Sequence, residues 1–202
     1  MPKTGMRDIR RQQFISAAID VILQDGLIGV SNARVASVAG LSSSLLPHYF
    51  TDRTLLLNAI LRQILDQCHV SAKEHLNRHA DPLDRLHILI DTYFREELFT
   101  PAMKRLCRDM YHATYHSDQL KATYTAYQRQ LLSAVRKEMR QLVSNRSLEA
   151  AIVGFVALLD GLWIKALREP VLLKPTDAAD LQKQYLRMIT TRIRIRAGDR
   201  LS

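Results

Sequence analysis

Apolar residues recur along this chain at intervals of three and four, which is the spacing of one face of an α-helix. In the first such stretch, from about Asp8 to Asp25, the face consists of Phe14, Ala17, Ala18, Val21 and Ile22. No stretch shows the strict alternation of polar and apolar residues that is typical of a half-buried strand. The pattern therefore predicts an all-α protein.

Two short helices are expected next. The first follows Ser31 or Asn32, either of which can cap free backbone N–H groups, and Gly40 ends it after about two turns. The second runs from Ser42, another capping residue, to Tyr49. Because such short helices need neighbours to be stable, we predict that the first 52 residues form one three-helix domain.

The helices lengthen after this point, and we assign residues 53–202 to a second, larger helical domain. Proline opens two of these helices, where the first turn needs no N–H donor. The predicted helices run from about Arg53 to His79, Pro82 to Phe99, Pro101 to His116, Asp118 to Val143, Ser147 to Arg168 and Thr176 to Arg194.

Composition narrows the class of protein without naming a partner. Hydrophobic residues make up 47% of the chain, enough for a substantial core, and the net charge of +9 is compatible with a polyanionic partner. Residues 1–70, however, hold seven basic and five acidic side chains. Bulk charge would equally suit a ribosomal or membrane-surface protein, so nucleic-acid binding must be argued from particular residues.

Cysteine usage and hydropathy indicate a cytoplasmic protein with no membrane partner. Cys68 and Cys107 lack the spacing of a disulfide framework or a zinc site. The N-terminus is polar and charged, unlike a secretory signal. The most apolar stretch, residues 150–167, is interrupted by Asp160 and Lys165, so we interpret it as a buried helix.

The junction between the two short helices has the form of a helix-turn-helix. Small Ala36 and Ala39 let the helices approach closely, Gly40 permits the turn, Leu41 fills the junction and Ser42 caps the second helix. In such a motif the second helix inserts its N-terminal residues into the major groove of DNA.

The segment from Val35 to Leu56, V-A-S-V-A-G-L-S-S-S-L-L-P-H-Y-F-T-D-R-T-L-L, resembles the helix-turn-helix of TetR-family transcriptional regulators in order and spacing. The resemblance covers the first sixty residues, and the later helices agree with the family in number and length. It implies a repressor that binds palindromic operator DNA as a homodimer and is released by a small-molecule effector. The residues that it places near DNA are Ser31, Ser42, Ser43, Ser44, His48, Tyr49 and Arg53, with the last two on phosphates.

Four basic residues precede or open the first helix: Lys3, Arg7, Arg10 and Arg11. They could add phosphate or minor-groove contacts, which would make binding strongly dependent on salt. Basic residues near a chain terminus are also ordinary solubilising groups, and both interpretations stay open.

The motif departs from the family pattern at two positions. Ser44 stands where the family usually has glycine, and Pro47 replaces a common aromatic residue. Proline deletes the N–H donor that would bond toward Ser43. We therefore expect a kinked or tighter recognition helix.

A ligand-responsive regulator needs a second site whose ligand prefers one conformation. Asp160 is the most informative candidate, because a carboxylate inside an apolar helix should be paired if it is buried. The candidate effector-binding residues are Tyr93, Phe94, Met103, Met110, Tyr111, Tyr127, Asp160 and Trp163.

A narrower resemblance concerns the segment Asp160-Gly161-Leu162-Trp163, together with His48-Tyr49-Phe50 and Met1-Pro2-Lys3. These segments resemble the choline-responsive BetI branch of the family. Aromatic faces beside a carboxylate could hold a quaternary ammonium group by cation–π attraction. Alternatively, Asp160 bonds an arginine or a backbone group and Trp163 packs in the core, so the identity of the effector stays open.

Operator geometry requires two recognition helices in successive major grooves, and the last two helices are the natural dimer interface. Small residues there would permit close packing, although the same residues could form a core within one chain. The expected interface residues are Ala151, Gly154, Phe155, Ala157, Leu158, Gly161, Leu162, Tyr185, Met188 and Ile189.

Neither enzymatic nor metal chemistry is predicted. The pairs His75 with His79 and His112 with His116 have a spacing that can share a metal ion, but neither has a third ligand nearby. No glycine-rich phosphate loop, metalloprotease motif or nucleophile elbow is visible, and no cofactor is expected. The rival hypothesis is a helical ligand-binding or adaptor protein without sequence-specific DNA binding.

Overall fold

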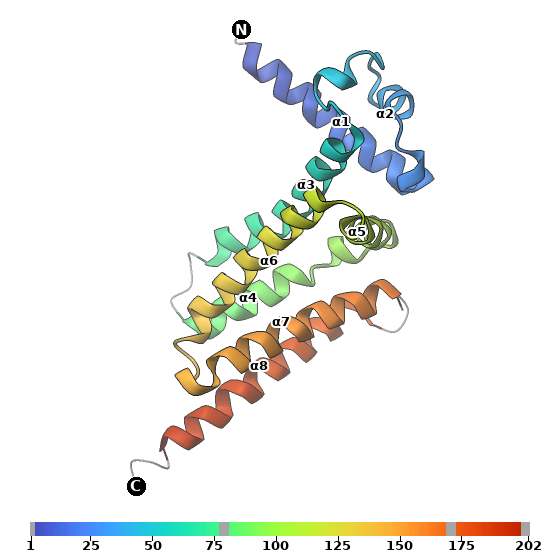
Figure 1. Cartoon of the computed structure of the whole chain (residues 1–202). Coiled ribbons are helices and arrows are strands. Elements are labelled where there is room, and N and C mark those ends of the chain that lie inside the picture. Colours follow the sequence, from blue (N-terminus) through green and yellow to red (C-terminus); the bar gives the residue numbers. More distant parts are fainter. Residues whose placement is uncertain (1–2, 77–80, 169–172, 199–202) are drawn as a thin grey trace. The chain divides into compact units, whose positions relative to one another are not determined.

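The computed structural model describes the backbone of residues 3–76, 81–168 and 173–198, and the side chains within 5–66, 81–165 and 173–190. The described part contains helices and no strand, so the all-α prediction is confirmed (Figure 1). The elements are α1 (Lys3–Asp25), η1 (Leu27–Gly29), α2 (Asn32–Ala39), η2 (Leu46–His48), α3 (Arg53–Leu76), α4 (Pro82–Tyr93), η3 (Glu96–Phe99), α5 (Pro101–Thr114), α6 (Asp118–Met139), α7 (Asn145–Arg168) and α8 (Pro175–Gly198), where η marks a 3₁₀ helix.

The chain forms two compact units. The first comprises residues 1–66 and 105–125, and the second comprises residues 67–104 and 126–202. The first unit therefore contains the motif region together with the beginning of α3 and parts of α5 and α6. The sequence divided the chain by function, into a DNA-binding domain of residues 1–52 and an effector-binding and dimerisation domain of residues 53–202. This functional division stays a prediction.

The first unit is built around α1, which packs against α2. All five residues of its predicted apolar face are buried, with at most 4% of any one exposed, so this prediction is confirmed. Leu46 of η2 and Phe50 are also buried, which anchors the segment that follows α2. Buried apolar side chains thus anchor the segment between α2 and α3 to the core of the first unit.

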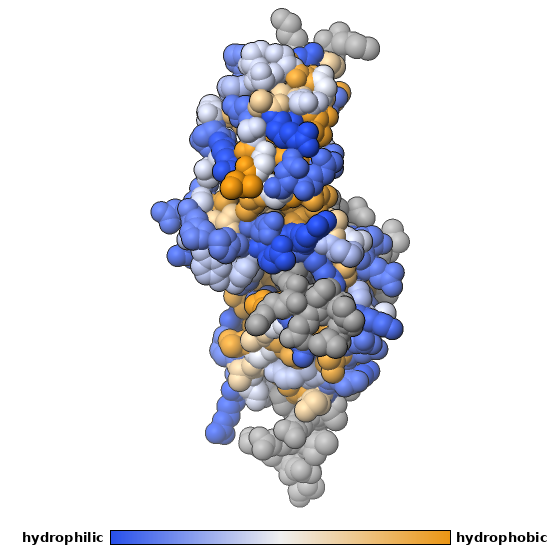
Figure 2. All heavy atoms as spheres, turned by 90° about the vertical axis from the view of Figure 1, so that its right-hand side faces the viewer, coloured by the Kyte–Doolittle hydropathy of each residue, from blue (hydrophilic) through white to orange (hydrophobic). Residues whose placement is uncertain are grey.

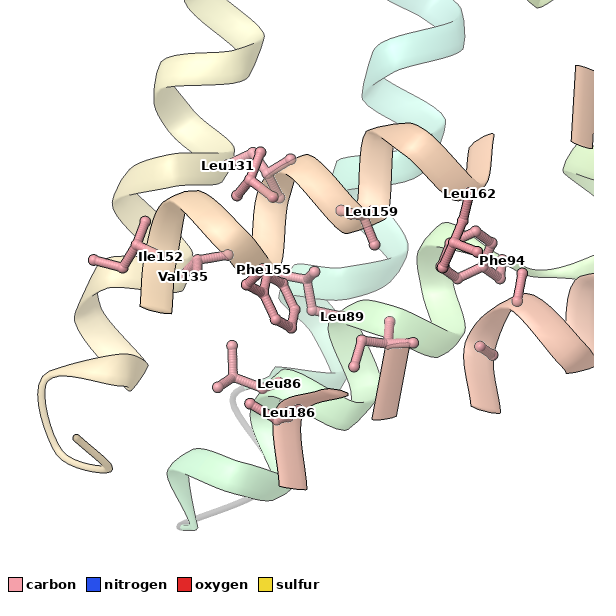
Figure 3. Packing of buried hydrophobic residues seen from close by; sticks show 14 of the residues in the cluster. Leu86, Leu89, Phe94, Leu131, Val135, Ile152, Phe155, Leu159, Leu162 and Leu186 are labelled. Carbon is pink, nitrogen blue, oxygen red and sulfur yellow. The ribbon is translucent and has the colours of Figure 1, made fainter. Parts of the chain in front are cut away.

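The second unit has a core formed by α4, α6, α7 and α8 (Figure 3). Phe155 of α7 is fully buried and points toward Leu86 and Leu89 of α4. The buried side chain of Gln182 donates a hydrogen bond of 2.9 Å to the carbonyl oxygen of Phe155, which joins α8 to α7. Apolar packing and this polar bond together fix the rotation of α7 about its axis.

Several helices end or begin a few residues away from their predicted bounds. α1 begins at Lys3 instead of Asp8, so the basic residues there belong to the helix. α4 ends at Tyr93 instead of Phe99, and the Tyr93 carbonyl accepts a hydrogen bond of 3.2 Å from the Trp163 indole. α6 ends at Met139, where the Met139 carbonyl accepts from both Leu142 and Val143.

α7 is the described helix whose length and apolar composition would allow it to cross a membrane, with a hydropathy of 1.7 over residues 145–165. Packing within the second unit accounts for one apolar face, which includes Ile152, Phe155 and Leu159. Another face carries exposed apolar residues, among them Val153 and Ile164. More generally, apolar side chains reach the surface in small areas between hydrophilic ones (Figure 2).

A test of the turn after α2 uses two glycines. Gly40 has φ of 66°, a left-handed conformation that other residues rarely adopt, whereas Gly5 lies within α1 with open space where an added Cβ would lie. Gly40→Ala should lower the free energy of unfolding by about 1 kcal/mol. Gly5→Ala should raise it by up to about 1 kcal/mol, because alanine favours a helix. Urea denaturation measures both, and equal effects would contradict the strained-turn argument.

Candidate functional site

The helix-turn-helix begins with a well-capped α2. The Ser31 hydroxyl accepts a hydrogen bond of 3.2 Å from the backbone N–H of Arg34, so Ser31, one of the two predicted candidates, caps the helix. At the other end, Leu41 N–H donates to the Ala36 carbonyl and Gly40 N–H donates to the Ser37 carbonyl. These bonds and the left-handed Gly40 end α2 after eight residues.

The predicted third helix, Ser42 to Tyr49, is wrong as an α-helix. The chain makes a turn over residues 43–45 and then the short 3₁₀ helix η2, which contains Pro47. Successive bonds join residues three apart: Leu45 to Ser42, His48 to Leu45 and Tyr49 to Leu46. Since Pro47 lacks an N–H, an α-helical bond to Ser43 cannot form. The expected tightening of this segment is confirmed.

Four predicted DNA-binding side chains of this segment are exposed: Ser42, Ser43, Ser44 and His48. The hydroxyls of Ser42 and Ser44 lie 2.8 Å apart and bond each other, and Ser44 N–H donates to the Ser42 hydroxyl. We call residues 42–48 the recognition turn. It presents hydroxyls and an imidazole on a backbone that is fixed by local hydrogen bonds.

Tyr49 and Arg53 have partners within the first unit. The Tyr49 ring lies 5.5 Å from that of Phe14, so its aromatic part packs on the core. The Arg53 guanidinium donates to the Leu27 carbonyl. These contacts position both side chains beside the recognition turn, and whether they also reach phosphates stays a prediction.

The N-terminal basic residues lie on α1. Arg7 is exposed, and the Arg11 guanidinium lies over the Phe50 ring at 5.1 Å. Arg10 is partly exposed. The side chain of Lys3 lies outside the described part of the structure. The four basic residues therefore belong to α1 and do not precede it.

In the second unit, four aromatic rings form a continuous cluster between α4, η3 and α7. The ring of Trp163 lies 5.0 Å from that of Phe99 and 5.7 Å from that of Tyr93, the latter edge to face. Phe94 lies within 6 Å of both Tyr93 and Phe99, at 5.7 and 5.8 Å. We call Tyr93, Phe94, Phe99 and Trp163 the aromatic cluster.

Asp160 lies at one end of this cluster. The Tyr93 hydroxyl is 3.5 Å from its carboxylate, and Gln128 also donates a hydrogen bond to it. Burial raises the pKa of Asp160 above its ordinary value, and the bonds from Gln128 and Tyr93 oppose that rise. Neither an arginine nor a backbone group satisfies this carboxylate in the described contacts, so it can accept a further donor or a cation.

The candidate effector residues are divided between the two units. Tyr93, Phe94 and Trp163 pack together and Asp160 bonds Tyr93, while Met103 packs against the same hydrophobic core. Tyr127 also belongs to the second unit. Met110 and Tyr111 belong to the first unit. There Tyr111 packs edge to face against Tyr115 and Tyr124.

Two polar residues near the cluster were not predicted. Gln128 bonds Asp160, and the Lys104 ammonium lies over the Phe99 ring at 5.3 Å. Phe99 itself belongs to the aromatic residues that sequence could select, but no local pattern marks Lys104 or Gln128. Tertiary packing brings Gln128 to the cluster, whereas Lys104 follows Phe99 closely in the chain.

The histidine pairs supply no metal cluster in the described residues. The rings of His112 and His116 lie 4.7 Å apart, and no group of three or more possible ligands occurs within the described ranges. His75 and His79 lie outside the described side chains.

α7 and α8 expose apolar and small residues on one side each. Ala151, Phe155 and Leu162, which sequence assigned to a dimer interface, are instead buried within the chain. Gly154 is covered by the Tyr185 hydroxyl, which would lie 2.1 Å from an added Cβ. Exposed apolar and small residues include Val153, Ala157, Gly161 and Ile164 of α7 and Leu181 and Met188 of α8, and we call these six the apolar stripe.

Comparison with known proteins places this fold in a family. Residues 82–191 match a family model for the C-terminal part of BetI-type transcriptional repressors. The HTH-type transcriptional regulator BetI of Klebsiella pneumoniae is 31% identical over 189 residues, which cover 93% of this chain and 97% of that protein. BetI of Stenotrophomonas maltophilia is 31% identical over 166 residues, 82% of this chain and 85% of that protein.

A solved structure with the same fold is a transcriptional regulator from Saccharomonospora viridis in complex with choline, with a TM-score of 0.75. It is 17% identical and covers 88% of this chain and 95% of its own. The helix-turn-helix and the helical second unit define a transcriptional regulator of the TetR class. Within that class, the chain belongs to the BetI-type family.

The raised pKa of Asp160 generates a test. A carboxyl with a raised pKa in the fold contributes stability below its ordinary pKa of 3.8, and this is lost as the pH rises through the raised value. Asp160→Asn keeps an acceptor for Tyr93 and removes the buried charge. The variant should therefore exceed the wild type in free energy of unfolding at pH 7, and the difference should close near pH 3.8.

Urea denaturation across this pH range measures the difference. The matched control is Asp20→Asn, which changes an exposed carboxylate on α1. A wild type that is more stable than Asp160→Asn at pH 7 would show that the charge is compensated within the chain.

Proposed function

We propose that the chain is a cytoplasmic, homodimeric repressor that binds palindromic operator DNA and is released by a small effector that carries a quaternary ammonium group. The observation that carries this proposal is the recognition turn, an exposed and locally bonded segment that follows a two-turn helix and a left-handed glycine. Its position in the motif matches the element that enters the major groove in helix-turn-helix proteins. BetI-type relatives over nearly the whole chain support the same function.

In this proposal Ser42, Ser43, Ser44 and His48 face the groove, and Ser31, at the N-terminus of α2, faces the backbone. A helix N-terminus favours the negative charge of a phosphate. Tyr49 and Arg53 lie beside the recognition turn, and the exposed Arg7 on α1 supplies positive charge. Lys3, Arg10 and Arg11 are the remaining residues that we propose to contact DNA. Contacts to phosphate position the protein, and the recognition turn supplies the base contacts.

Dimerisation follows from the apolar stripe. Two residues of α7, Ala157 and Gly161, are small and exposed, which would let a helix of a second copy approach closely. Larger apolar residues flank them, with Val153 62% and Met188 57% exposed. An apolar surface of this kind is stabilised when a second copy covers it. We therefore assign the dimer interface to α7 and α8.

The aromatic cluster and Asp160 form the proposed effector site. Aromatic faces attract a quaternary ammonium group, and a carboxylate at the edge of the cluster balances its charge. Choline is bound by one structural relative, which supports an effector of this class. Coupling to DNA requires only that the effector bind one conformation more tightly than the other.

A change in the recognition turn tests DNA binding. Ser43→Asp puts a negative charge on an exposed position, and repulsion from phosphates should lower operator affinity by about tenfold or more. Ser16→Asp, at an exposed position of α1, is the matched control and should leave the affinity near the wild-type value. Fluorescence anisotropy with a palindromic DNA selected in vitro measures both.

Retained affinity in a folded Ser43→Asp variant would place the DNA contacts elsewhere. Equal wild-type affinity for every DNA sequence, or none for any, would favour the rival, a ligand-binding or adaptor protein without sequence-specific DNA binding.

A charge in the apolar stripe tests dimerisation. Ala157→Glu should convert the dimer to a monomer at micromolar concentration, because the carboxylate would be buried without a partner. Ala126→Glu changes an exposed alanine of α6 and should leave the dimer intact. Sedimentation velocity gives the mass of each, and a dimeric Ala157→Glu protein would move the interface away from α7.

A further inference from the structure

Lys104 is a cationic residue beside the aromatic cluster. The residue is only 8% exposed, and its ammonium lies over the face of Phe99 at 5.3 Å. Within the described residues, no carboxylate forms an ion pair with it. The described contact of this ammonium is an aromatic ring and not the counter-charge that a lysine in a largely buried position normally has.

The helix that carries Lys104 adds positive potential at the same place. Lys104 is the fourth residue of α5, whose first turn contains no acidic residue. The N-terminus of a helix bears a partial positive charge, which favours anions and disfavours cations. Thr100 caps only one backbone donor there, the N–H of Met103 at 3.2 Å. The lysine and the helix N-terminus are therefore two positive features at one place, and no described carboxylate forms an ion pair with the lysine.

The opposite end of the aromatic cluster is negative. From Lys104 the contacts run to Phe99, then to Trp163, then to Tyr93, whose hydroxyl reaches Asp160. The cluster thus has an ammonium at one end and a carboxylate at the other, and both belong to the second unit. A ligand with a positive charge alone would be attracted by Asp160 and repelled by Lys104.

We infer that the effector is a zwitterion, with its quaternary ammonium group against Asp160 and the aromatic rings and its carboxylate against Lys104. This inference rests on the proposed effector site and specifies the ligand class that the site selects. Charge complementarity at both ends gives specificity, because a ligand that lacks the carboxylate leaves Lys104 without a counter-charge.

The test compares ligands that differ in one group. Choline and trimethylglycine share the trimethylammonium group and differ in carrying a hydroxymethyl group or a carboxylate. γ-Trimethylammoniobutyrate and its alcohol form a second pair with a longer spacing between the charges. Isothermal titration calorimetry on the full-length protein should show that the acid of at least one pair binds about tenfold or more tightly than its alcohol.

Lys104→Met tests whether the lysine causes the preference for the acid, because the variant should change the affinities for acid and alcohol differently. Methionine keeps the length of the side chain and can pack on Phe99. The variant should bind the preferred acid about tenfold more weakly and bind the matching alcohol as tightly as, or more tightly than, the wild type. Lys104→Arg keeps the charge and should retain the preference for the acid. Circular dichroism confirms that each variant is folded.

The outcomes separate the two proposals. An alcohol that binds as tightly as its acid in both pairs, or a preference for the acid that persists in folded Lys104→Met, would overturn the zwitterion inference and leave a cationic effector standing. If Lys104→Met does not fold, the ligand pairs on the wild type decide. Binding of neither alcohol nor acid would reject the proposed effector class, and the inference with it.

Discussion

The burial of one face of α7 determines what its other faces can do. Successive residues of a helix are separated by about 100° around its axis, so fixing one side chain fixes the directions of the rest. Ile152, Phe155 and Leu159 are fully buried, and Gln182 holds the Phe155 carbonyl. Asp160 therefore stands beside the aromatic cluster, while the apolar stripe faces away from this core. The proposed effector site and the proposed dimer surface depend on the same rotation of one helix.

Much of the fold could be predicted because its signals are local. Helical spacing located the buried face of α1, the hydroxyl of Ser31 marked the start of α2, and Gly40 marked its end. The end of α4 could not be predicted in this way. Its last carbonyl bonds the indole of Trp163, a residue seventy positions away. No pattern near Tyr93 contains that information.

In the candidate effector site, too, some residues could be selected from the sequence and others could not. Asp160 and Trp163 could be selected because a carboxylate and an indole are conspicuous within an apolar helix. Lys104 could not, since its significance comes from lying over Phe99. Residue type alone grouped Tyr111 with the effector residues, and it packs with other tyrosines in the first unit, so its part in the site stays a prediction. Residue type identifies candidates, and packing decides which of them meet.

Pro47 affects how much conformational entropy the recognition turn loses when it binds a partner. Its ring fixes one backbone dihedral, and the hydrogen bonds around it hold η2 between two buried residues, Leu46 and Phe50. A segment that is already ordered loses less conformational entropy when it docks on a partner. The same rigidity limits its ability to adjust to an imperfect surface. The recognition turn therefore binds at a low entropic cost but adapts little to its partner. Replacing Pro47 with a residue of freer backbone should alter discrimination between partners more than it alters the fold.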